Sequence, residues 1–224
     1  MSDPRDLLQP FPVMGTSIPP ERYRKLDLSA EATGGFICDP YYSMGEWIRK
    51  VDEDGRYCAY GGYLEKRGFY TAGQYVKNPS NVRNIHLGVD IWLPAGIPVY
   101  APFDGLVHSY AFNDKPLDYG GTIILEHREG PFHFYSLYGH LSKASIKNIE
   151  VGQCITRGSE FCQLGGKEEN GGWYPHLHLQ LIKDIGRFSG DYPGVVAEQN
   201  GNIISNCPDP SFMVLPDIEL PTDL

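Results

Sequence analysis

The sequence lacks the features that proteins need to cross a membrane or to hold nucleic acid. No apolar run is long enough to span a bilayer, and the first ten residues are charged and show no secretory leader pattern. With 19 Lys and Arg against 28 Asp and Glu, the formal net charge is -9, which does not attract phosphates or anionic lipids. We expect no nucleic-acid or membrane partner and, unless a leader has been removed, a cytoplasmic location.

Cysteines are few and their spacing forms no pairs. An odd number without any Cys-x-x-Cys favours reduced, buried thiols over a disulfide framework. The same spacing argues against a zinc site built from cysteines. The five residues are Cys38, Cys58, Cys154, Cys162 and Cys207.

Glycine, proline and tyrosine are abundant. Their counts of 26, 18 and 15 in 224 residues favour many short strands joined by tight turns over long helices. A chain of this length holds one sizeable core with extensions. We therefore expect a mainly β fold, α+β overall, with one or two helices.

The residue pattern divides the chain into four parts. Residues 1–35 are rich in proline and predict an extended arm. Residues 36–79 predict a helical and aromatic extension packed on the core, with a helix from Asp39 to near Gly55. Residues 80–184 predict a sheet, and residues 185–224 a loop and tail. The expected strands of the sheet are 97–102, 105–110, 122–127, 132–141 and 177–182.

All seven histidines lie between His86 and His178, which favours a metal or proton-transfer site. In Pro175-His-Leu-His-Leu-Gln-Leu181, strict alternation on a strand places His176, His178 and Gln180 on one face and three leucines in the core. The Cα atoms of the two histidines are then roughly 6.5 Å apart, which suits one metal ligand beside one base. A polar pair on a solvated sheet face is the alternative.

A second pattern, His-x-x-x-Asp, joins His86 to Asp90. Fully extended, its ends would lie roughly 13 Å apart, too far for two ligands each about 2 Å from one zinc. The chain must bend, and Gly88 permits this. A surface histidine and a capping aspartate would explain the pattern as well.

A third pattern, Tyr138-Gly139-His140, places a phenol and another imidazole on one strand face. Taken together, two histidines and one carboxylate make the ligand set of a catalytic zinc whose fourth position is left for water. Zinc lowers the pKa of that water toward about 7 and polarises a carbonyl oxygen, which indicates amide hydrolysis. The absence of His-Glu-x-x-His excludes the helical zinc site of thermolysin-like proteases.

In this order the three patterns resemble the lysostaphin/LytM family of β-lytic zinc metallopeptidases, which cleave peptide cross-links of bacterial cell walls. The resemblance covers residues 80–184 and implies a small antiparallel β-structure with its site in a groove on the sheet. It also implies one zinc ion, held by His86, Asp90 and His178, with His140 and His176 acting on the water and the developing oxyanion. Tyr138 is the expected hydrogen-bond donor to that oxyanion.

The segment before the last pattern departs from the wall-cleaving members. They carry Gly-x-x-Gly-x-Ser/Thr-Gly, whereas residues 165–175 read GGKEENGGWYP, as in a subtype that resembles the module fused to aminotransferases. Glu65 and Arg67 predict a surface ion pair, with recognition of a charged substrate end as the alternative. Trp173 is either loop packing or a substrate wall. His108, His127 and His133 are expected to be structural or solvated.

Three functions follow from these patterns. The first is a zinc endopeptidase acting on peptidoglycan-type or glycine-containing peptides. The second is a cytoplasmic zinc amidohydrolase acting on a small peptide or amide. The third is a binding module without activity, which ranks last because no ligand of the set is missing.

Overall fold

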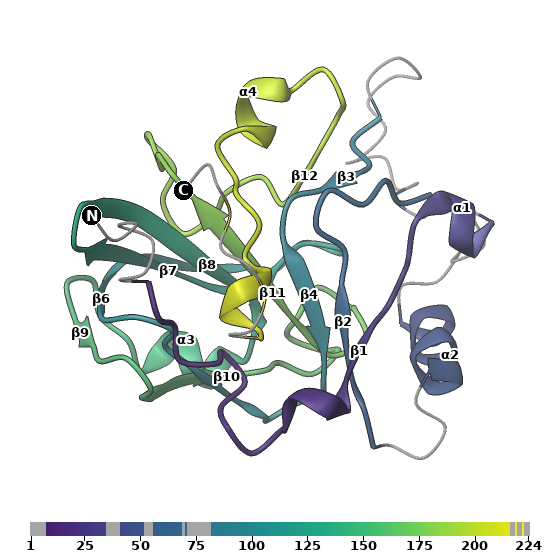
Figure 1. The fold of residues 1–224 in the computed structure, drawn as a ribbon, viewed down its shortest axis with the longest axis horizontal. Coiled ribbons are helices and arrows are strands. Elements are labelled where there is room, and N and C mark those ends of the chain that lie inside the picture. Colours follow the sequence, from purple (N-terminus) through teal and green to yellow (C-terminus); the bar gives the residue numbers. More distant parts are fainter. Residues whose placement is uncertain are drawn as a thin grey trace.

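An eight-stranded sheet runs through the molecule (Figure 1). The computed structural model describes residues 8–34, 41–51, 56–68, 70, 82–215, 218 and 221. Neighbouring strands of the sheet are antiparallel except β1 and β2, which are parallel. In spatial order the strands are β1 (Tyr23–Lys25), β2 (Cys58–Gly61), β4 (Val89–Trp92), β11 (His176–Ile182), β8 (Phe132–Leu141), β7 (Gly120–Glu129), β6 (Gly105–Asn113) and β9 (Cys154–Ile155).

Two small sheets and several short helices complete the described chain. β5 (Pro98–Tyr100) pairs with β10 (Glu160–Gln163), and β12 (Val195–Val196) pairs with β3 (Ile85–His86). The helices are α1 (Ala30–Thr33), α2 (Tyr42–Val51), α3 (Lys143–Lys147) and α4 (Gly201–Ile204), with 3-10 turns at Pro20–Arg22 and Ser211–Met213. The predicted mainly β fold is confirmed. Among the described residues, no helix combines the length and apolar character needed to cross a membrane.

The five runs predicted as strands all form strands. They correspond to β5, β6, β7, β8 and β11, and three of these form an antiparallel meander in which each strand pairs with the next. A tight turn at Gly130, whose φ is 57°, joins β7 to β8. β8 is one edge of this meander, and β11 pairs with that edge.

The sheet continues into the segments that precede the predicted core. β2 pairs with β4, and β1 in the arm pairs with β2. α1 and α2 lie beside these strands at one end of the molecule (Figure 1). The predicted helix is present as α2, while its predicted ends at Asp39 and Gly55 fall outside the described residues. The division of the chain into four parts stays a prediction. The sheet includes strands from the first three of these parts.

Alternation along β11 sorts its side chains between core and cavity, as predicted. Leu177, Leu179 and Leu181 are fully buried in the largest apolar cluster. His176 and His178 face the other way and line a cavity. The buried leucines on one face of the strand therefore fix the direction in which the histidines on the other face point.

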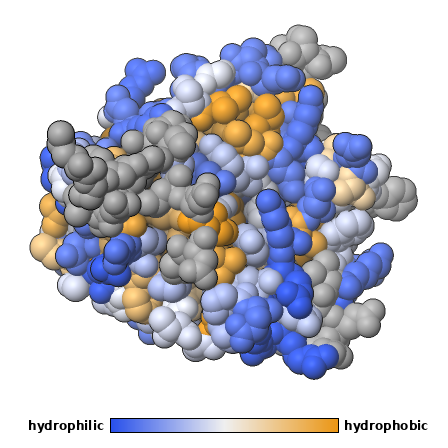
Figure 2. All heavy atoms as spheres, viewed as in Figure 1, coloured by the Kyte–Doolittle hydropathy of each residue, from blue (hydrophilic) through white to orange (hydrophobic). Residues whose placement is uncertain are grey.

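The thiols match the prediction with one exception. Cys58, Cys162 and Cys207 are buried, but Cys154 is exposed because it lies on the short edge strand β9. Cys38 lies outside the described residues. On the face shown in Figure 2, hydrophilic side chains surround separate apolar patches.

Truncation of Leu179 to alanine tests whether β11 is held by its apolar face. The side chain is 0% exposed, so Leu179→Ala is expected to lower the free energy of unfolding by about 2–5 kcal/mol. Denaturant unfolding measures this loss. Val151→Ala, at a side chain that is 67% exposed, is the control and should change stability by less than about 0.5 kcal/mol. Equal losses in the two variants would contradict the assignment of Leu179 to the core.

Candidate metal centre

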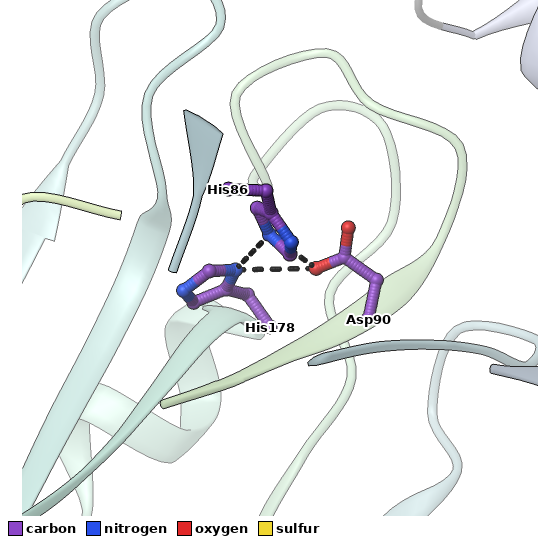
Figure 3. A group of neighbouring side chains, drawn as sticks. All are labelled: His86, Asp90 and His178. Atoms are coloured by element: carbon purple, nitrogen blue, oxygen red, sulfur yellow. Dashed lines mark hydrogen bonds and ion pairs between the residues drawn. The ribbon is translucent and has the colours of Figure 1, made fainter. Parts of the chain in front are cut away.

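Three side chains from three strands point toward one another (Figure 3). Asp90 on β4 stands directly opposite His178 on β11 in the antiparallel register. His86 at the end of β3 joins them because the chain turns at Leu87 and Gly88 before β4 begins. Ligand atoms of the three residues all lie within 4.8 Å of one another.

The bend between His86 and Asp90 requires glycine. A Cβ atom at Gly88 would lie 2.5 Å from the carbonyl oxygen of Leu179 and 2.8 Å from the ring of His178. Contacts this short do not occur for real Cβ atoms, so a larger residue would push β11 away. The predicted bend at Gly88 is therefore present, and it brings His86 close to His178.

The distances between the facing atoms suit a single small cation. His86 Nε2 lies 2.9 Å from His178 Nδ1 and 3.3 Å from Asp90 Oδ1. His178 Nδ1 lies 3.1 Å from the same oxygen. Ligand atoms about 2.0 Å from a tetrahedral zinc ion are ~3.3 Å apart, so the triangle has the dimensions of a zinc site.

Hydrogen bonds on the far sides of the imidazoles fix where their protons are. His86 Nδ1 donates to the carbonyl oxygen of Gly62 at 2.9 Å, and His178 Nε2 donates to Gln180 Oε1 at 3.0 Å. Burial, together with the nearby Arg67 guanidinium, lowers the pKa of His86 to about 4 and keeps this ring neutral. A neutral imidazole has one N–H, so His86 Nε2 faces His178 and Asp90 with a lone pair.

The facing atoms decide the chemistry of the centre. Two imidazole nitrogens and one carboxylate oxygen face one another, and all three residues are buried. A cation held among the three atoms balances the buried negative charge. His86, Asp90 and His178 can therefore hold a metal ion, and this donor set with two nitrogens and one oxygen fits zinc.

Two further imidazoles stand at the centre with a proton-accepting nitrogen. His140 Nδ1 donates to the carbonyl oxygen of Asn170 at 2.9 Å, and His176 Nδ1 donates to that of Tyr174 at 2.7 Å. Their Nε2 atoms are left as acceptors, and that of His176 lies 3.8 Å from Asp90 Oδ1. The ring centroids are 4.1 Å apart. Burial lowers the pKa of both rings, so both are neutral.

Tyr138 does not join this group, and the prediction that it shares a face with His140 is wrong. Its ring is fully buried in the apolar core, where its hydroxyl accepts a hydrogen bond from Ser136 at 2.9 Å. The reason is an irregularity in β8: the register with β7 shifts between Gly121 and Ile123, and His140 has a φ of 63°. A bulge of this kind breaks the alternation and sends Tyr138 and His140 to opposite faces.

Tyr119 lies where a phenol was expected from Tyr138. Its hydroxyl is 3.4 Å from His178 Nε2, and its ring centroid is 5.6 Å from that of His140. Tyr119 lines the same cavity as the three candidate metal ligands and the two further imidazoles, His86, Asp90, His178, His140 and His176. Sequence reasoning missed Tyr119 because it precedes β7 in a turn-like Asp-Tyr-Gly-Gly segment that shows no motif.

Glu65 and Arg67 do not form a surface ion pair, and that prediction is wrong. The Arg67 side chain is 2% exposed, with Nε 2.6 Å from Glu65 Oε2 and Nη1 2.7 Å from Asp90 Oδ2. Burial alone would raise the pKa of Asp90, but His86 and Arg67 hold it well below its usual range. The pair thus belongs to the metal centre, where Arg67 lines the cavity wall.

A cavity of about 370 Å³ opens over the centre. Trp173 lines it and is also packed in an apolar cluster, so its packing role is confirmed and its role as a substrate wall stays a prediction. Its ring centroid lies 6.1 Å from His140 and 6.3 Å from His176. Charged side chains that the sequence did not single out, Arg83, Lys115, Asp118 and Asp191, also line the cavity.

Sequence comparison finds relatives for the part of the chain that carries the centre. The model of peptidase family M23 matches residues 84–189. The peptidoglycan DD-endopeptidase ShyA of Vibrio cholerae is 34% identical over 102 residues, which are 43% of this chain and 20% of that protein. The DD-carboxypeptidase/endopeptidase Mpg of Neisseria meningitidis is 29% identical over 140 residues, 58% of this chain and 29% of that one. The match thus spans between a fifth and a third of these curated relatives.

Among solved structures, similarity is found to the catalytic domain of the antimicrobial peptidase lysostaphin from Staphylococcus simulans. The identity is 26%, with 53% of this chain and 79% of that chain covered and a TM-score of 0.38. A zinc-containing peptidase from Vibrio cholerae is 28% identical, with 46% and 29% covered and a TM-score of 0.37.

Metal analysis tests the centre directly. The purified protein is expected to hold about one zinc ion per chain after dialysis against a zinc-containing buffer. His178→Ala removes one of the three donors and should lose the bound zinc, as elemental analysis measures. His133→Ala is the matched control, because this imidazole is exposed and bonds Glu126 away from the cavity. A folded wild-type protein without zinc would contradict the assignment.

Proposed function

Residues 84–189 form a domain of peptidase family M23, and we propose from this premise that the chain is a zinc-dependent peptidase that hydrolyses peptide bonds of peptidoglycan. The observation that supports the proposal most is the convergence of three buried ligand atoms beside two neutral imidazoles in one cavity. They provide a candidate metal site and two candidate bases beside the same cavity.

Zinc, when bound by His86, Asp90 and His178, supplies a Lewis acid that polarises a carbonyl oxygen and lowers the pKa of water toward about 7. The chain's own residues do the rest. His140 and His176 are neutral because burial lowers the pKa of each, so their Nε2 atoms can accept the proton of the attacking water. The Nε2 atom that accepted this proton can return it to the departing amine. The hydroxyl of Tyr119 is the donor placed to hydrogen-bond the carbonyl oxygen as its charge grows.

The substrate class rests on the relatives and on the cavity. ShyA and Mpg are named for endopeptidase activity, and ShyA for its action on peptidoglycan. A cavity of about 370 Å³ lined by aromatic and charged side chains suits a short peptide stem that bears charges of its own. Endopeptidase action on peptidoglycan-type or glycine-containing peptides is therefore the function we propose. The expected cytoplasmic location gains no support from ShyA, whose named substrate is peptidoglycan.

A zinc amidohydrolase acting on a small soluble peptide is the second candidate. The observation in its favour is the position of Trp173, Met44 and Tyr174, which wall the cavity beside the histidines. A walled site favours a substrate with little chain beyond the cleaved bond. A binding module without activity requires a missing ligand or base, whereas the centre has three donors and two imidazoles.

Replacement of His140 separates metal binding from hydrolysis. His140→Ala removes a base but none of the three metal ligands, so the variant should keep its zinc and lose about 10²-fold or more in kcat. Release of soluble fragments from purified cell-wall sacculi, compared with cleavage of short soluble stem peptides, measures the activity and distinguishes the two candidates. Wild-type protein that binds zinc and cleaves neither substrate would defeat the proposal.

Two tyrosines provide a matched test of the oxyanion donor. Tyr119→Phe removes only the hydroxyl at the cavity and is expected to lower kcat by about 10²-fold at unchanged zinc content. Tyr138→Phe removes the hydroxyl in the core and should leave kcat unchanged while costing about 1 kcal/mol of stability. Steady-state kinetics with stem peptides and denaturant unfolding give the two readouts. If Tyr138→Phe lowered kcat and Tyr119→Phe did not, Tyr138 would be the oxyanion donor.

A further inference from the structure

The two oxygens of Asp90 face different partners. Oδ1 faces the metal-binding nitrogens, 3.1 Å from His178 Nδ1 and 3.3 Å from His86 Nε2. Oδ2 accepts a hydrogen bond from Arg67 Nη1 at 2.7 Å. Both side chains of this pair are nearly fully buried, with 2% and 3% exposed. One oxygen is therefore left for the cation while the other is occupied by the guanidinium.

Arg67 is itself held in place from two other directions. Its Nε donates to Glu65 Oε2 at 2.6 Å, and Nη1 also lies 3.1 Å from the hydroxyl of Tyr70. The second oxygen of Glu65 accepts the backbone N–H of Leu28 at 2.7 Å. A continuous series of hydrogen bonds thus runs from the N-terminal arm to the metal ligand. All of its members except Asp90 lie outside the residues matched by the family model, 84–189.

We propose that Arg67, supported by Glu65, is a positioning residue for the metal site: it fixes Asp90 as a ligand through a single oxygen. The segment before the family domain then supplies a working part of the metal centre. This inference rests on the zinc site of the proposed function. It concerns the strength and geometry of metal binding, and Arg67 itself takes no part in the reaction.

The physical reason is the cost of a buried carboxylate. A buried carboxylate without a partner is strongly destabilised, and its side chain can rotate to offer either oxygen or both. The planar guanidinium contacts Glu65 and Asp90 at once, which a lysine ammonium on a flexible stem does less well. Groups that orient metal ligands in this way typically change metal affinity by about 10–100-fold when they are removed.

Arg67→Met tests the proposal, because it keeps a long apolar stem and removes the donors. Zinc affinity, measured by competition with a chromophoric chelator, should fall by about 10–100-fold. Arg67→Lys retains the charge and should recover part of that loss. The rise in melting temperature that zinc produces in the wild type should shrink in Arg67→Met, because weaker binding stabilises less by mass action.

Lys66→Met is the matched control. Lys66 is the neighbour of Arg67 in sequence, and its ion pair with Glu198 is exposed, with side chains 61% and 79% accessible. Its removal should leave zinc affinity unchanged. Glu65→Gln provides a second route to the same contact, since it removes the charge that holds Arg67, and it decides the matter if Arg67→Met does not fold. Zinc affinity in Glu65→Gln is expected to fall below that of the Lys66→Met control.

The outcomes separate this inference from the proposed function. Wild-type protein that takes up no zinc would defeat the proposed function. Wild type that binds zinc, with Arg67 and Glu65 variants that bind it equally tightly, would overturn the positioning role alone. Variants that melt lower by the same amount with and without zinc, at unchanged zinc affinity, would assign Arg67 a purely structural role and also overturn it.

Discussion

The structure depends on one electrostatic constraint: two imidazole nitrogens and a carboxylate oxygen meet in a buried place. His86 Nε2, His178 Nδ1 and Asp90 Oδ1 lie 2.9 to 3.3 Å apart, and the other ring nitrogens of the two histidines bond Gly62 and Gln180. A cation held among the three atoms balances the buried negative charge. The surrounding elements serve to hold these atoms together.

The sheet provides the rigidity that this arrangement needs. β11 pairs with β4 on one side and β8 on the other, so the strand carrying His176 and His178 is a central strand. Its three leucines are fixed in the core, which sets the direction of the two histidines on the opposite face. The bulge in β8 then turns His140 toward them. Two imidazoles and the metal site are thereby placed around one cavity.

Charge balance links the site to the earlier part of the chain. Asp90 has a buried negative charge, and the positive charge of Arg67 balances it. The negative charge of Glu65 also contacts Arg67. One negative charge remains to face a metal ion. The hydrogen bond from the backbone N–H of Leu28 to Glu65 ends this series and links the arm to the site.

Local patterns in the sequence were enough to predict much of the site. The alternation from His176 to Leu181 and the bend at Gly88 depend on the geometry of a few neighbouring residues. The main strands and the meeting of His86, Asp90 and His178 were therefore predicted correctly, while the roles of these residues and of His140 and His176 stay predictions. Tertiary structure alone decided three other points. The bulge reversed Tyr138, the loop before β7 brought Tyr119 to the cavity, and long-range packing buried Arg67 against Asp90. Periodicity is set by the local backbone, whereas register shifts and buried ion pairs depend on residues far apart in the chain, and no single segment contains that information.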